Sequence, residues 1–191
     1  MLNILLIRTG ATEYDSQRRV QGTLNVPLSE AGQQQIERVA TELAPQTIDA
    51  LYAGPCNAAK QTGEILADRL DLKVKTLDKL ANLDHGLWQG MLIEEVKAKQ
   101  PKVYRQWQEN PESVCPPEGE TLQATRERLH QVLAKLVKKH KSGAVAVVAP
   151  EPLVSLIRNI LRDEDLGNLW HAQQQNGQLW EVIAVPAEAK S

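Results

Sequence analysis

The sequence predicts an α/β fold with a mostly parallel central sheet, and three observations support this prediction. Short apolar runs at residues 3–7 and 48–53 read as buried strands. Between them, residues 32–43 carry apolar side chains at helical spacing. A strand–helix–strand unit of this kind makes a right-handed crossover, which places its two strands in parallel. Residues 144–149 form a third, strongly apolar strand.

The remaining elements follow in chain order. Ser29 is expected to cap the 32–43 helix, with Glu30 and Gln33 in its first turn. Pro55 suits the start of the next helix, because its fixed φ angle is helical. The other predicted elements are a helix to residue 70, a strand at 74–77, an irregular segment at 80–90, two short helices within 92–110 broken at Pro101, a loop at 111–119, a long helix at 121–140, a helix at 152–161 and a last strand at 178–185.

Length and composition narrow the class of protein. The chain has 191 residues, 42% hydrophobic and 24% charged, which is typical of one globular domain spanning 1–191. The net charge is -2, so we expect no nucleic-acid partner. No apolar run approaches the roughly 20 residues that span a membrane, and the N-terminus does not resemble a signal peptide. For the same reason we expect no membrane partner. Cys56 and Cys115 are predicted to be reduced thiols, so we expect a cytoplasmic protein.

A series of short motifs occurs in a fixed order along nearly the whole chain. They are the segment 6–12, Arg19, 21–22, 27–29, Gly32, Gln35, Pro55, Ala59, 61–62, Leu80, Gly86, Trp88, Gly90, 119–121 and Arg128. In their order and spacing they resemble the histidine phosphatase superfamily, which has the phosphoglycerate-mutase-like fold. The resemblance implies a three-layer α/β/α sandwich.

The resemblance also shows that this chain departs from the family at the positions that carry its chemistry. The family uses a histidine nucleophile, two arginines, a second histidine and a carboxylic acid. Here Arg8 keeps the first arginine, whereas the nucleophile, second arginine, acid and second histidine positions hold Thr9, Ala58, Asn82 and Pro150. The resemblance therefore implies a degenerate member that lacks most catalytic residues.

These departures have a large expected cost. A threonine hydroxyl is a weak nucleophile without an adjacent base. Asn82 cannot replace a general acid, which usually contributes a factor of about 10²–10⁴. Loss of one strong charge-stabilising donor costs roughly 3–4 kcal/mol. We therefore predict a pseudoenzyme that is inactive by the phosphohistidine route; if active, it would be a phosphomonoester phosphatase.

An anion site is predicted around Arg8, because a guanidinium at the carboxyl end of a strand suits phosphate or carboxylate oxygens. Backbone N–H groups at Gly10 and at the start of the Pro55 helix would add donors. The alternative for Arg8 is a structural ion pair. Glu151 is expected to face solvent or the helix N-terminus, and it would repel a phosphate. The predicted anion-binding set is Arg8, Gly10, Arg19, Gln21, Gly22, Thr23 and His85, with Arg18 also at the mouth.

Other functions remain open at this point. One is a rebuilt phosphatase or hydrolase that uses Thr9 and His85 with Asp84 or Glu151. A second is a structural dimerisation module, with a homodimer or another protein as partner. For the predicted pseudoenzyme, the expected ligand of the Arg8 site is a phosphorylated or other anionic small molecule. We expect no cofactor and no metal, because the remaining histidines lack the spacing of metal ligands; they are His130, His140 and His171. The four tryptophans are predicted to be packing residues; they are Trp88, Trp107, Trp170 and Trp180.

Overall fold

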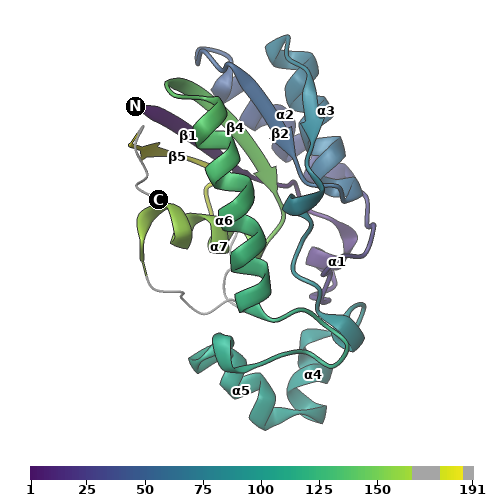
Figure 1. Cartoon of the computed structure of the whole chain (residues 1–191). Coiled ribbons are helices and arrows are strands. Elements are labelled where there is room, and N and C mark those ends of the chain that lie inside the picture. Colours follow the sequence, from purple (N-terminus) through teal and green to yellow (C-terminus); the bar gives the residue numbers. More distant parts are fainter. Residues whose placement is uncertain (165–176, 187–191) are drawn as a thin grey trace.

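A five-stranded sheet forms the centre of the protein, which is described by a computed structural model over residues 1–164 and 177–186 (Figure 1). The strand order is β3-β2-β4-β1-β5. The first four strands are parallel to their neighbours, and β5 runs antiparallel to β1. The strands are β1 (Leu2–Arg8), β2 (Ala50–Ala53), β3 (Val74–Thr76), β4 (Gly143–Ala149) and β5 (Trp180–Val185). The predicted α/β fold with a mostly parallel sheet is confirmed.

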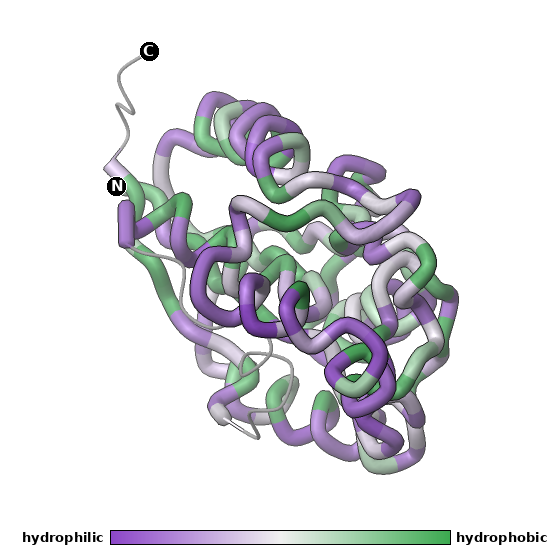
Figure 2. Tube along the Cα trace, turned by 90° about the horizontal axis from the view of Figure 1, so that it is seen from below, coloured by the Kyte–Doolittle hydropathy of each residue, from purple (hydrophilic) through white to green (hydrophobic). Residues whose placement is uncertain are grey.

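Helices cover both faces of this sheet, as the three-layer prediction requires (Figure 1). Those longer than one turn are α2 (Glu30–Leu43), α3 (Asn57–Leu70), α4 (Ile93–Lys99), α5 (Pro101–Glu109), α6 (Leu122–Lys139) and α7 (Leu153–Arg162). Helices α2 and α3 pack on one face, and α6 and α7 pack on the other. Their hydrophilic residues lie along the outer turns (Figure 2).

Each inner strand supplies both cores, because successive side chains of a strand point to opposite faces. In β4, Val145 and Val147 join the cluster under α6 and α7, whereas Ala146 and Val148 join the cluster under α2 and α3. All four are essentially inaccessible to solvent. Burial on two faces explains why residues 144–149 read as a continuous apolar run.

Helix boundaries follow local sequence signals. Ser29 caps α2 as predicted, because its Oγ accepts a hydrogen bond from the Gly32 N–H at 3.1 Å. One short helix, α1 (Glu13–Ser16), is not among the elements predicted from the sequence. Its signal is a capping box, in which the Thr12 N–H donates to Asp15 Oδ2 at 2.7 Å and the Asp15 N–H donates to Thr12 Oγ1 at 3.4 Å.

A group of buried rings links the irregular 80–90 segment to α5. The rings of Trp88 and Trp107 pack edge-on with their centroids 5.9 Å apart, and the centroids of the His85 and Trp107 rings are 5.5 Å apart. Gly86 adopts a φ of 51°, and a Cβ there would come within 2.1 Å of the Pro117 carbonyl oxygen. The packing role predicted for Trp88 and Trp107 is confirmed, whereas Trp170 and His171 lie outside the described residues.

Candidate functional site

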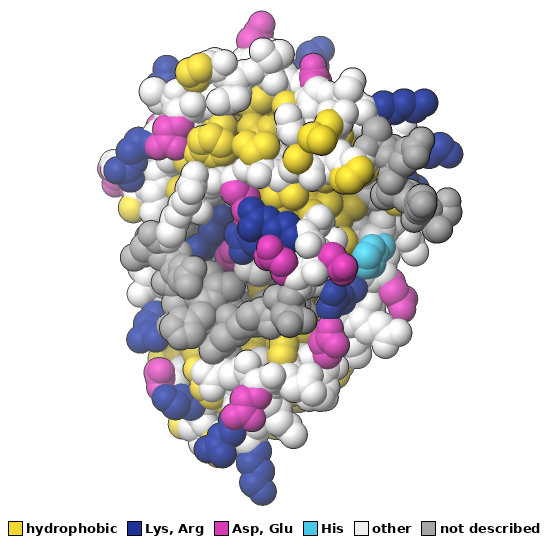
Figure 3. Space-filling view, turned by 90° about the vertical axis from the view of Figure 1, so that its left-hand side faces the viewer, with side chains coloured by type: hydrophobic (Ala, Val, Ile, Leu, Met, Phe, Trp, Pro, Cys, Tyr) yellow, Lys and Arg dark blue, Asp and Glu magenta, His cyan; other side chains and the backbone are white. Residues whose placement is uncertain are grey.

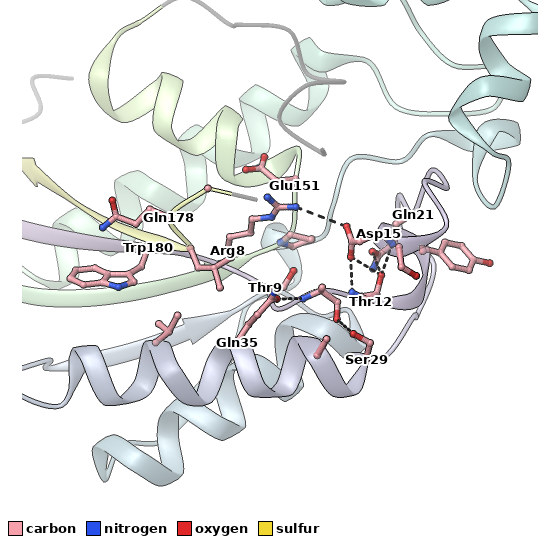
Figure 4. A pocket seen from close by; sticks show the side chains of 18 of the residues that line it. Arg8, Thr9, Thr12, Asp15, Gln21, Ser29, Gln35, Glu151, Gln178 and Trp180 are labelled. Carbon is pink, nitrogen blue, oxygen red and sulfur yellow. Dashed lines mark hydrogen bonds and ion pairs between the residues drawn. The ribbon is translucent and has the colours of Figure 1, made fainter. Parts of the chain in front are cut away.

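A cavity of about 890 Å³ opens where the carboxyl ends of β1 and β4 meet the start of β5 (Figure 4). A ligand site at this edge is usual for open α/β sheets. The loop after β1, helix α1, one face of α2 along its length and the loop after β4 form most of its wall. The charged lining residues are Arg8, Asp15, Arg18, Arg19, Arg38, Glu42 and Glu151, and the larger uncharged ones include Tyr14, Gln21, Gln35, Gln178 and Trp180.

Arg8 ends β1 and reaches the cavity with 18% of its side chain exposed. One of its terminal nitrogens lies 4.0 Å from Asp15 Oδ1. Glu151 lies beside the same guanidinium (Figure 4). Arg8 therefore lines the cavity, as an anion-binding residue would, and also lies within ion-pair distance of Asp15, as the structural alternative predicts.

Glu151 lies two residues before the start of α7 and is fixed by hydrogen bonds to its first turn. Its Oε2 accepts hydrogen bonds from the Ser155 hydroxyl at 2.8 Å and from the Ser155 N–H at 3.2 Å. Burial raises the pKa of this carboxyl above its usual value, although the Arg8 charge and the Ser155 hydrogen bonds oppose that effect. The predicted helix-terminal position of Glu151 is confirmed, and this residue also lines the cavity.

The backbone donors of the loop after β1 are already used within the protein. The Thr9 N–H donates to the Ala149 carbonyl at 3.1 Å, and the Gly10 N–H donates to Thr62 Oγ1 at 3.3 Å. The Ala11 N–H donates to Gln35 Oε1 at 2.9 Å. The expectation that Gly10 offers its N–H to an anion is therefore wrong. Gly10 is required for packing, since a Cβ there would lie 2.4 Å from the Gly32 carbonyl oxygen.

The four altered family positions have different surroundings. Thr9 and Pro150 line the cavity, and Thr9 is 7% exposed. Ala58 is completely buried in the apolar cluster between α2, α3 and the sheet. Asn82 is also buried, and its amide donates to the carbonyl oxygens of Gly22 at 3.0 Å and Glu151 at 3.1 Å. Asn82 thus ties together two loops at the cavity.

The residues predicted for the mouth divide into two groups. Arg18, Arg19 and Gln21 line the cavity. The Arg19 guanidinium also donates to the Gly90 carbonyl at 2.7 Å. The Gln21 amide nitrogen is buried and has no hydrogen-bond partner within residues 1–164 and 177–186.

The second group does not reach the cavity, so this part of the prediction is wrong. Thr23 donates from its N–H to Gln89 Oε1 at 2.7 Å, and Gly22 serves as acceptor for Asn82. His85 is fully buried, and burial lowers its pKa to about 4. The Gly86 turn directs the His85 ring towards Trp107 instead of the cavity.

Several cavity residues were missed from the sequence. Asp15 could have been found, because Thr12 and Asp15 have capping-box spacing next to Arg8. Gln35, Arg38 and Glu42 lie on one face of α2, but helical spacing alone does not say that this face borders a cavity. Trp180, predicted as a packing residue, lines the cavity, and its indole N–H donates to Glu42 Oε2 at 2.7 Å.

The types of cavity residue restrict the chemistry. Of the histidines in the described ranges, none lines the cavity. His130 is exposed on α6, and His140 lies 2.9 Å from the Tyr52 hydroxyl. Over the same ranges, no three His, Cys, Asp or Glu side chains are grouped as a metal site would require. No described helix is both long and apolar enough to cross a bilayer.

These features define an α/β protein with a cavity lined by charged side chains at the carboxyl edge of its sheet. The sequence profile of the Histidine phosphatase superfamily (branch 1) matches residues 4–188, and the chain belongs to this family.

Individual relatives agree with this assignment. The chain is 32% identical to Phosphoserine phosphatase 1 of Hydrogenobacter thermophilus over 170 residues, 89% of this chain and 81% of the relative. It is 29% identical over 168 residues to Bifunctional protein Rv2228c of Mycobacterium tuberculosis; this match covers 87% of the chain and only 46% of that relative, about half its length. The structure of Bacillus stearothermophilus YhfR matches with a TM-score of 0.82 and 24% identity over 89% of this chain and 84% of that one, and it supports the fold alone.

Proposed function

We propose that this chain is a member of the family that does not catalyse phosphoryl transfer through phosphohistidine, and that its Arg8 cavity binds an anionic small molecule. The observation that carries the proposal is the absence of a lining histidine among the described residues. A phosphohistidine route requires an imidazole nitrogen in contact with the phosphoryl group. His85, the histidine nearest in sequence to the family's acid position, is buried against Trp107.

The remaining altered positions support the same proposal. Asn82 cannot protonate a leaving group, and its side-chain amide donates hydrogen bonds to two backbone carbonyl groups. Ala58 brings no charge, and its position is enclosed by apolar side chains. Arg8 remains at the cavity and can bind phosphate, sulfate or carboxylate oxygens through its planar guanidinium.

A second candidate is a weakly active phosphatase. It is favoured by the name of the relative Phosphoserine phosphatase 1. In such an enzyme Thr9 would have to act with a cavity carboxylate, because the burial of His85 removes it from that role.

The test is hydrolysis of p-nitrophenyl phosphate by the purified chain between pH 4 and 9, with Arg8→Ala as the control. We expect the two proteins to give the same background rate. Turnover that depends on Arg8 would overturn the proposal and favour the weak phosphatase. Binding is measured separately by calorimetry with phenyl phosphate and with simple carboxylates. Binding that is lost in Arg8→Ala is expected, and unchanged binding would refute the assignment of Arg8.

A further inference from the structure

The charge around Arg8 differs from that of a site built for a dianion. Asp15 lies 4.0 Å from the guanidinium, and Glu151 lies on another side of it (Figure 4). A phosphate brought to Arg8 would therefore approach two carboxylates. Because Coulomb repulsion scales with the product of the charges, a dianion is repelled about twice as strongly as a carboxylate monoanion.

The donors that a phosphate would use are also occupied. The backbone N–H groups of Thr9, Gly10 and Ala11 donate to other parts of the protein. The first turn of α7 could offer N–H groups to an anion, but the Glu151 carboxylate already accepts from Ser155 there. The Glu151 carboxyl group thus occupies donors that a ligand oxyanion could have used.

A second group of charged side chains lies outside the cavity. On the face that carries β5 and α7, basic and acidic side chains alternate (Figure 3). There Arg162 lies 2.5 Å from Glu181, which also pairs with Arg158. The Arg8 cavity differs from this face because the carboxyl groups of Asp15 and Glu151 flank one guanidinium that lines a large cavity (Figure 4).

We propose that the Arg8 cavity recognises a zwitterion of the amino-acid type in preference to a phosphomonoester dianion. The ligand's carboxylate would bind Arg8, and its ammonium group would lie between Asp15 and Glu151. The aromatic rings of Tyr14 and Trp180 line the same cavity and are available to the rest of the ligand. The volume of about 890 Å³ is within the usual range for small-molecule sites. The inference rests on the proposed binding function of Arg8.

Three probes that share a phenyl group separate the charge types. L-Phenylalanine carries a carboxylate and an ammonium, 3-phenylpropionate carries the carboxylate alone, and phenyl phosphate is the dianion. Their dissociation constants are measured on the purified full chain by calorimetry at pH 7.5. We expect L-phenylalanine to bind at least about tenfold more tightly than either of the others, since only it pairs with both signs of charge.

Two conservative variants test the role of the carboxylates. Glu151→Gln and Asp15→Asn each keep an oxygen that can accept the existing hydrogen bonds, while the negative charge is removed. In each we expect L-phenylalanine to bind about tenfold more weakly and phenyl phosphate about tenfold more tightly. Glu64→Gln, an exposed change of the same kind on α3, is the matched control and should leave all three constants unchanged.

The outcomes distinguish this inference from the proposed function. Equal binding of the probes, or tightest binding of phenyl phosphate or 3-phenylpropionate, overturns the zwitterion preference and leaves the Arg8 binding function intact. No binding of any probe, or binding that Arg8→Ala does not weaken, overturns both. The ranking on the unaltered chain decides the matter even if a variant fails to fold.

Discussion

Replacing Asn82 by aspartate tests whether this position has a structural or a catalytic role. The change installs a carboxyl group where the family has its acid. In this structure, however, the Asn82 amide holds the Gly22 and Glu151 carbonyls at 3.0 and 3.1 Å, in a buried position. A carboxylate cannot donate to either carbonyl and places a negative charge against both. Leaving a buried group unsatisfied costs about 1–3 kcal/mol. We therefore expect Asn82→Asp to lower the free energy of unfolding by about 3–5 kcal/mol at neutral pH.

Urea unfolding followed by circular dichroism measures this loss. Protonation gives the new carboxyl group one donor, so the loss should shrink as the pH falls from about 7 to about 5. Asn57→Asp is the control, because Asn57 is exposed at the start of α3, where a negative charge is favourable by a few tenths of a kcal/mol. A loss below about 0.5 kcal/mol would refute the reasoning. It would mean that the side chain at position 82 turns into the cavity, where it could act as an acid.

Three further changes test the structure around the site. Burial lowers the pKa of His85 to about 4, so the imidazole takes up a proton at a higher pH in the unfolded chain than in the folded one. The free energy of unfolding should therefore fall by about 3 kcal/mol as the pH drops from about 6.5 to about 4. His85→Leu should remove that part of the acid sensitivity in urea titrations; an unchanged pH profile would contradict it. Gly32→Ala should destabilise by at least about 2 kcal/mol, because the new Cβ would lie 2.0 Å from the Ala11 carbonyl oxygen, and an unchanged melting temperature would count against this. Arg128→Met should cost about 2–4 kcal/mol in denaturant unfolding, since Arg128 pairs with Glu120 at 2.8 Å and donates to two carbonyls; a loss below 1 kcal/mol would show these bonds to be dispensable.

The fold could be predicted because its signals are local. Apolar runs such as 144–149 and the cap at Ser29 place β4 and α2 close to their observed bounds. The antiparallel direction of β5 was not specified, because an isolated apolar strand carries no information about its partner.

The site could be predicted only in part. Arg8 was found because it ends a strand at the ligand edge of the sheet. His85 was misplaced because the direction of its ring depends on the left-handed turn at Gly86 and on contact with residues 116–119, which are distant in sequence. The occupied N–H groups of the Thr9 loop were equally hidden, since their acceptors Ala149, Thr62 and Gln35 come from three other parts of the chain.

The altered positions have structural uses that make the family's catalytic residues hard to install by single substitutions. An arginine in place of Ala58 would put a charge into a completely buried apolar cluster. A carboxyl group in place of Asn82 would break the tie between two loops. Because catalytic groups act as a unit, neither change alone would bring a compensating rate. Under the proposed function, a route from this sequence to phosphohistidine catalysis passes through less stable intermediates, and selection for stability would tend to retain the present set of residues.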